Sequence, residues 1–304
     1  MVIFCGSSQP RATAQESPIS QTTSTLPHIP IGEIAMATKD TLSDAFLERL
    51  VDELVSTDIV AIALAGSYAR GDATRWSDVD IIRYATTMPA TSEERYTLAI
   101  RDGRLISVST TTIATKQAEL TQPELAIFAV PGLRQARILH DPSGALAALH
   151  QQARDFSWEP LHAAASAYAS EMVMGLAEEA HKLLGALNSH DESATLYAAH
   201  GAVLGLTRAV AVGWGVLVES ENSYYRQVQE AAGLDSAWTR YHRTAAGLVA
   251  ATSHATPAVA IGVAALHLYR ETASLLAPLL LPRHLPVIEA TLDVIAASGI
   301  RAET

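Results

Sequence analysis

The chain has little of several residue types that mark common protein classes. Cys5 is the only cysteine among 304 residues, which excludes an intrachain disulfide framework and a thiolate metal site. Aromatic residues make up 6% and charged residues 17% of the chain, whereas hydrophobic residues make up 49%. The composition therefore predicts a protein with a sizeable hydrophobic core, in keeping with a reducing, cytoplasmic environment.

Basic residues are scarce as well. The chain has 21 Lys and Arg against 32 Asp and Glu, a net charge of −11, and both of its halves are acidic. Because a polynucleotide-binding protein needs a basic groove, we expect no nucleic-acid partner, and a polymerase or RNA-tailing enzyme is disfavoured. An acidic surface suits small cationic or neutral substrates, although it suits a plain soluble protein equally well.

Long membrane-type apolar runs are also missing. The nearest candidate, residues 199–218, contains His200, Arg208 and four glycines, and we interpret it as a buried helix. The N-terminus lacks the basic and apolar regions of a secretory signal. We therefore expect a cytoplasmic protein with no membrane partner.

Three segments differ in composition and periodicity. Residues 1–38 are rich in Ser, Thr, Gln and Pro and predict a disordered or loosely ordered leader. Residues 39–157 mix helical and strand patterns and predict an α+β domain, a mixed sheet flanked by helices. Residues 158–304 consist of Ala- and Leu-rich helical stretches and predict an all-α helical bundle. The bundle could close on itself or form the interface of a homodimer.

Periodicity and turn residues place the elements within these segments. In the first domain they predict helices at 41–54, 91–100, 123–130 and from 144, and strands at 59–65, 79–84, 105–111 and 133–139. After residue 158 they predict helices at 160–187, 192–218, 221–233, 236–253, 257–277 and 284–298.

One short stretch carries most of the functional information. It begins Gly66-Ser67-Tyr68-Ala69-Arg70-Gly71 and continues to Ser77-Asp78-Val79-Asp80. On a strand, the side chains of Asp78 and Asp80 point to one face, where two carboxylates need a divalent cation to offset their repulsion. Gly66 lets phosphate approach the backbone, and Ser67 and the adjacent amides can donate hydrogen bonds to it. Arg70 either steers phosphate or is a solvated loop residue.

The motif resembles that of the DNA-polymerase-beta-like nucleotidyltransferase superfamily, in particular its small-molecule and minimal branches. There, Gly-Ser-x-Ala-Arg-Gly precedes Ser-Asp-x-Asp. The helical half looks like that of the kanamycin nucleotidyltransferases. The resemblance implies that Asp78 and Asp80 bind Mg²⁺ and a nucleoside triphosphate, ATP or another one. It also implies that Lys182, in the helical half, contacts the triphosphate. The alternative for Lys182 is an exposed ion pair with Glu178.

The chain departs from this family at the third carboxylate. Active members usually carry it on a later strand, where this chain has Ser107, or Ser109 as the alternative position. The base could instead come from the helical half, metal coordination alone could activate the acceptor, or the protein could bind nucleotide without catalysis. Candidates for the base are Glu171, Glu178 and Glu179.

A further group of residues could line an acceptor pocket or belong to the core or an interface: Glu219, Glu221, Tyr224 and Tyr225. For Trp76, we favour packing on the domain over stacking on a base.

Three functions follow from the resemblance. The first is Mg²⁺-dependent transfer of a nucleoside monophosphate to a hydroxyl of a small molecule, aminoglycoside antibiotics being prominent family substrates. An acidic cleft would suit such a polycation. The second is modification of a protein, as in toxin–antitoxin pairs, and the third is nucleotide binding without catalysis.

Overall fold

The computed structural model describes residues 39–249 and 256–300. The predicted leader, residues 1–38, lies outside these residues. The described residues belong to one compact unit. The predicted boundary at 157/158 falls in the connection between a helix that ends at Arg154 and a short 3₁₀ helix that begins at Glu159, and it stays a prediction.

A five-stranded mixed sheet organises the first half of the described chain, as predicted. Its strands are β1 (Ile59–Ala65), β2 (Val79–Ala85), β3 (Tyr96–Arg101), β4 (Arg104–Thr111) and β5 (Arg137–His140). They lie in the order β3-β4-β2-β1-β5. The pair β2–β4 is parallel, and the other neighbouring pairs are antiparallel. The prediction of a mixed sheet is therefore confirmed.

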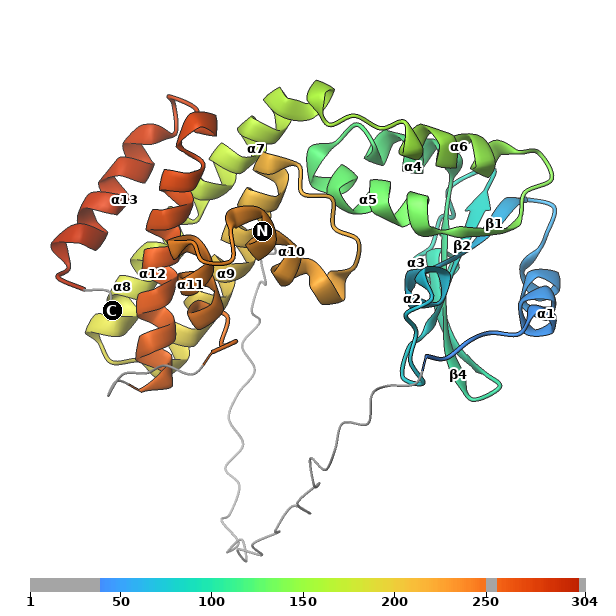
Figure 1. The fold of residues 1–304 in the computed structure, drawn as a ribbon, viewed down its shortest axis with the longest axis horizontal. Helices are drawn as coiled ribbons and strands as arrows, with labels where there is room; N and C mark the ends of the chain where they lie inside the picture. The colour runs from blue at the N-terminus through green and yellow to red at the C-terminus, as the bar shows by residue number, and fades with distance from the viewer. Residues whose placement is uncertain (1–38, 250–255, 301–304) are drawn as a thin grey trace, which may run out of the picture. The chain divides into compact units, whose positions relative to one another are not determined.

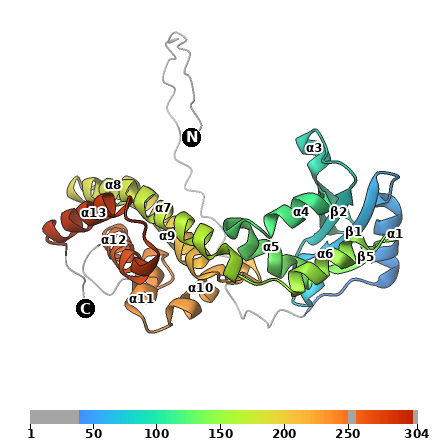
Figure 2. The same ribbon diagram turned by 90° about the horizontal axis from the view of Figure 1, so that it is seen from above.

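Helices cover both faces of this sheet (Figure 1). They are α1 (Asp44–Leu54), α2 (Gly66–Arg70), α4 (Ile113–Glu119), α5 (Pro123–Gln135) and α6 (Ala145–Arg154). A further short helix, α3 (Ser92–Arg95), has no buried residue. The apolar stripe of α1 packs on one face, against residues such as Ile62 and Ile81. On the opposite face α5 and α6, side by side in Figure 2, pack against Ala63 and Tyr84. The central strand β1 is consequently buried on both sides, whereas the edge strand β3 is largely exposed.

Two of the predicted elements in this half are wrong. Residues 91–100 form only the one-turn helix α3 and then strand β3. The turn Asp102-Gly103, with φ of 50° and 74°, folds β3 back onto β4, and cross-strand pairing outweighs the weak helical pattern. The strand predicted at 133–139 is shorter, because α5 continues to Gln135 and β5 begins at Arg137.

The second half of the described chain is helical, as predicted. Its helices are α7 (His162–Gly175), α8 (Ala177–Asn188), α9 (Glu192–Trp214), α10 (Tyr224–Ala232), α11 (Ala237–Ala245), α12 (Pro257–Leu275) and α13 (Leu285–Ala297). The single helix predicted at 160–187 is divided at Leu176, which ends α7 and precedes α8. One hydrophobic core joins these helices.

Among the described helices, α9 alone has the length and composition to cross a membrane. However, 61% of its most apolar window is buried inside the protein. It contacts α7, α8 and α12, so it is the central helix of this core.

Candidate active site

The two aspartates of the motif lie where β2 begins. Asp78 directly precedes the strand, and Asp80 is its second residue. In the sheet, Asp80 is paired with Ala65 at the end of β1 and with Ser107 on the parallel strand β4. The sheet thus holds Asp80 between the end of β1, where α2 begins, and Ser107 on β4.

Gly66 allows the chain to turn directly beside Asp80. Its φ is +63°, in the left-handed region, and a Cβ on it would lie 2.0 Å from Oδ2 of Asp80. No other residue type fits both conditions without a shift of the carboxylate. The predicted Gly-Ser turn is in fact the short helix α2, which ends at Arg70 and is capped by Gly71.

An open pocket of about 670 Å³ contains the predicted site. Four segments line it: the β1–α2 junction, the loop before β2 together with the start of β2, strand β4, and the segment just before α10. The lining residues that bear on chemistry are Gly66, Ser67, Arg70, Trp76, Asp78, Asp80, Ser107 and Glu221. The structure therefore brings together Asp78, Asp80, Gly66, Ser67 and Arg70, five of the six predicted site residues.

Lys182, the sixth, is not among the residues that line this pocket. Its ammonium lies 2.8 Å from Glu179 and 3.1 Å from Glu178, both on the same helix. These contacts match the alternative of an exposed ion pair. Glu171, Glu178 and Glu179 are likewise absent from the lining, so the geometry does not favour them as bases.

Burial, together with the neighbouring charges of Asp78 and Glu221, raises the pKa of Asp80 to about 6. Arg70 and a hydrogen bond from Ser107 act in the opposite direction. The side chain of Arg70 is only 19% exposed and also donates to Asp72. Arg70 is thus not a solvated loop arginine but a partly buried cation beside the carboxylates.

Strand β4 offers no carboxylate to this site. Ser107 is buried, lies opposite Asp80, and has its Oγ 3.5 Å from the Tyr96 hydroxyl. Glu221, in the 3₁₀ turn before α10, lines the same pocket from the helical half of the chain and acts electrostatically on Asp80. The sequence indicates Glu221 only as an acceptor-pocket candidate, because nothing in a linear sequence shows which loop reaches the sheet.

Trp76 differs from our expectation. Its side chain is 81% exposed rather than packed on the domain, it lines the pocket, and the Arg75 guanidinium lies 4.2 Å from its ring centroid. An exposed indole at a pocket rim is available for stacking on a ligand.

The donor set fits Mg²⁺ in part. Mg²⁺ prefers oxygen ligands and commonly uses one or two carboxylates, completing its shell with substrate phosphates and water. Asp78 and Asp80 supply such a pair, and their mutual repulsion would be relieved by a cation. Within residues 39–249 and 256–300, no group of three or more His, Cys, Asp or Glu side chains forms a metal site. A metal here would therefore depend on the nucleotide for its remaining ligands.

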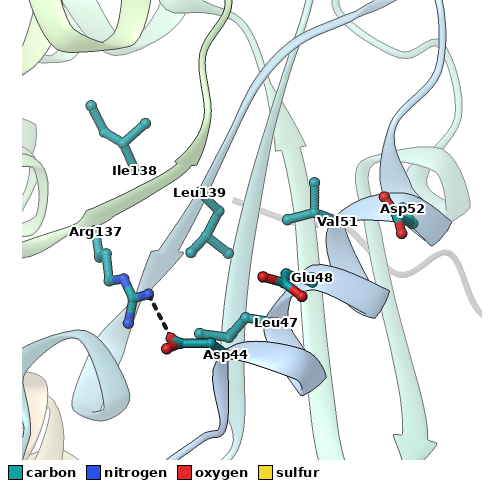
Figure 3. A pocket seen from close by; sticks show the side chains of 8 residues that line it. All are labelled: Asp44, Leu47, Glu48, Val51, Asp52, Arg137, Ile138 and Leu139. Atoms are coloured by element: carbon teal, nitrogen blue, oxygen red, sulfur yellow. Dashed lines mark hydrogen bonds and ion pairs between the residues drawn. The ribbon is translucent and has the colours of Figure 1, made fainter.

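A separate depression of about 420 Å³ lies between α1 and β5 (Figure 3). Asp44, Glu48 and Asp52 face it from one turn after another of α1, and Arg137 Nη2 lies 3.3 Å from Asp44. It shares no lining residue with the pocket of Asp78 and Asp80. The Asp44–Arg137 contact is a surface ion pair of the kind that contributes little to stability.

Comparison with protein-family models agrees with the motif. Residues 46–105 match the sequence model of a family described as "Nucleotidyltransferase domain". This range includes Gly66, Ser67, Asp78 and Asp80 but ends before Ser107. Among solved structures, one similar protein is a nucleotidyltransferase-like protein from Exiguobacterium sibiricum 255-15. It shows 13% identity and a TM-score of 0.44 over 82% of this chain and 88% of that one. No curated protein sequence matches the chain.

Proposed function

We propose that the protein is a Mg²⁺-dependent nucleotidyltransferase that moves a nucleoside monophosphate from a nucleoside triphosphate, ATP foremost, to a hydroxyl of a small molecule. The match of residues 46–105 supports nucleotidyl transfer in general. The observation that carries the proposal is the Asp78–Asp80 pair beside Gly66 and Ser67 in one pocket.

The residues of the motif that line this pocket have defined tasks in this proposal. Asp78 and Asp80 would hold Mg²⁺, which when bound offsets the charge of the triphosphate and polarises its α-phosphate. The Ser67 hydroxyl donates a hydrogen bond to phosphate, and the Arg70 guanidinium attracts it. Ser107 lies beside Asp80 on the neighbouring strand β4.

The transfer forms one bond and breaks one. The acceptor oxygen bonds to the α-phosphorus, and the bond from that phosphorus to the bridging oxygen breaks, so pyrophosphate leaves with the electron pair. The proton of the acceptor hydroxyl must go to a base, and the Glu221 carboxylate is the base that this pocket offers from outside the aspartate pair. This assignment replaces the carboxylate that β4 lacks.

The charge of the pocket favours a cationic acceptor. Three carboxylates, those of Asp78, Asp80 and Glu221, line it against the single cation Arg70. Mg²⁺ would offset two of these charges, and the remaining negative charge of Glu221 would favour the approach of a cationic acceptor. Aminoglycoside-type antibiotics are therefore the first acceptors to test.

The test uses ATP labelled in its α-phosphate, Mg²⁺ and a panel of aminoglycosides. We expect label on at least one acceptor with the wild-type protein and none above background with Asp78→Asn or Asp80→Asn. Ser109→Ala, which changes a neutral residue of the same pocket, is the matched control and should retain transfer. Undiminished transfer by both aspartate variants would overturn the proposal.

A further inference from the structure

A second cavity opens from the same face of the sheet as the site. It has a volume of about 260 Å³ and shares Ala65 and Ile82 with the pocket of Asp78 and Asp80. Ile82 is two residues beyond Asp80 on β2, so both side chains point to one face. Two residues of strand span about 6.6 Å. The distance from the carboxylates to the start of the cavity is therefore roughly the length of one sugar.

The walls of this cavity are apolar and fixed in place. Leu125, Phe128, Ala129 and Leu133 of α5 face Ile82 and Tyr84 of β2. The Phe128 ring packs against Tyr224 at a centroid distance of 5.7 Å, and the Arg208 guanidinium lies 5.8 Å from its centroid. Pockets for whole drug-sized ligands usually measure about 300–1,000 Å³. This smaller cavity suits a single planar ring system.

Its few polar lining residues are Tyr84, Lys116 and Glu119. Tyr84 is 0% exposed, yet its hydroxyl has no hydrogen-bond partner among the described residues. Buried hydroxyl groups are normally paired, and phenylalanine would fill the same space without this penalty. Nearby, Lys116 Nζ lies 2.8 Å from Glu119 Oε2, so the rim carries both donors and acceptors.

We propose that this cavity binds the nucleobase of the donor nucleotide, with the Tyr84 hydroxyl and the Lys116–Glu119 pair facing the polar edge of the base. The inference rests on the proposed function and extends it to the recognition of the base. A nucleobase combines a flat apolar face with an edge of donors and acceptors, as the lining requires. A polyhydroxylated, cationic acceptor matches it poorly, because most of the lining is apolar.

Two variants test the cavity while leaving the carboxylates intact. Gly132 lines the cavity from α5 at an exposed position, and a Cβ there meets no atom within 4 Å, so Gly132→Leu adds bulk at the cavity mouth without a clash. Gly185→Leu is the matched control, since Gly185 is also helical and has the same open space, on α8. Tyr84→Phe removes only the unpaired hydroxyl.

Dissociation constants for Mg²⁺–ATP and for Mg²⁺–tripolyphosphate, which lacks a base, give the readout. We expect Gly132→Leu to weaken ATP binding about tenfold or more and to leave tripolyphosphate binding unchanged, as Gly185→Leu should for both ligands. Tyr84→Phe should weaken ATP binding about 2- to 10-fold, the value of one hydrogen bond, without lowering the thermal unfolding midpoint.

Each other outcome contradicts the proposal in a distinguishable way. If Gly132→Leu and Tyr84→Phe both bind ATP like the wild-type protein, the base lies elsewhere. If Gly132→Leu raises only the KM of the acceptor, the cavity belongs to the acceptor and the nucleobase assignment is wrong. If the wild-type protein binds neither ATP nor tripolyphosphate with Mg²⁺, the proposed function itself fails, and the nucleobase subsite with it.

Discussion

Replacing Asp80 by asparagine should stabilise the metal-free protein at neutral pH. The folded structure holds this carboxylate half-buried, against Gly66 and near the charges of Asp78 and Glu221. Its pKa is raised from 3.8 to about 6. Asparagine has nearly the same shape and keeps the contact with Ser107, but it removes the charge that burial disfavours.

The sign and size follow from the two pKa values. Because the folded protein binds this proton more tightly than the unfolded chain, the contribution to stability is fully present below about pH 3.8 and is lost as pH rises through about 6. Two pH units correspond to about 3 kcal/mol. Since part of the side chain contacts water, screening reduces this value, and we expect a loss of about 1–2 kcal/mol.

Urea unfolding in EDTA between pH 3.5 and about 8 measures the effect. Asp80→Asn should match the wild-type protein near pH 3.5 and exceed its free energy of unfolding by about 1–2 kcal/mol at pH 7.5. Ser109→Ala, a neutral change in the same pocket, should leave the pH dependence unaltered. A variant that is less stable than the wild-type protein at pH 7.5, or a difference independent of pH, would refute the reasoning.

Three further predictions concern Gly66, Asp40 and Glu221. Gly66→Ala places a Cβ 2.0 Å from the Asp80 carboxylate in a left-handed backbone, so urea unfolding should show a loss of about 1–3 kcal/mol and calorimetry a loss of Mg²⁺–ATP binding. The Arg104 guanidinium and Tyr68 hydroxyl lower the pKa of Asp40 to about 2. Asp40→Asn should therefore cost about 1 kcal/mol at pH 7, a difference that disappears as pH falls toward 2 in acid-unfolding curves. Glu221→Gln should lower kcat about 10²- to 10⁴-fold while the Kd of Mg²⁺–ATP stays constant; an unchanged kcat would show that the proton goes elsewhere.

Local sequence sufficed for the part of the site that lies on one strand–turn–strand unit. The apolar run 59–65 is β1 to the residue, and the spacing of Asp78 and Asp80 places both at the start of β2. Ser107, the position expected for the missing acid, is paired on β4 with Asp80 on β2. These features depend on strand periodicity and on contacts between near neighbours in sequence, which a linear pattern encodes.

Features that depend on distant segments could not be derived in this way. The exposed side chain of Trp76 reflects a loop that leaves its ring uncovered, whereas its apolar character alone suggested packing. The approach of Glu221 to Asp80 brings together residues 141 positions apart, through a 3₁₀ turn whose sequence has no distinguishing motif. Lys182 fits a phosphate contact by residue type, but two glutamates on its own helix already pair with it.

The exchange of a sheet carboxylate for Ser107 has a consequence for how the proposed reaction is controlled. A third acid on β4 would be fixed by the same backbone that holds Asp80, so the site would be complete within the sheet. Here the sheet supplies the metal ligands and the hydroxyl of Ser107, while the proposed base stands on the segment before α10. Val218, three residues earlier, anchors this segment through a 2.7 Å hydrogen bond from its N–H to the Ile127 carbonyl of α5. Helix α5 also lines the cavity proposed for the nucleobase. A nucleotide bound against α5 would therefore influence the position of Glu221. Substitutions that loosen the contact between residues 127 and 218 should therefore lower kcat more than they weaken nucleotide binding, which single-turnover and equilibrium measurements can separate.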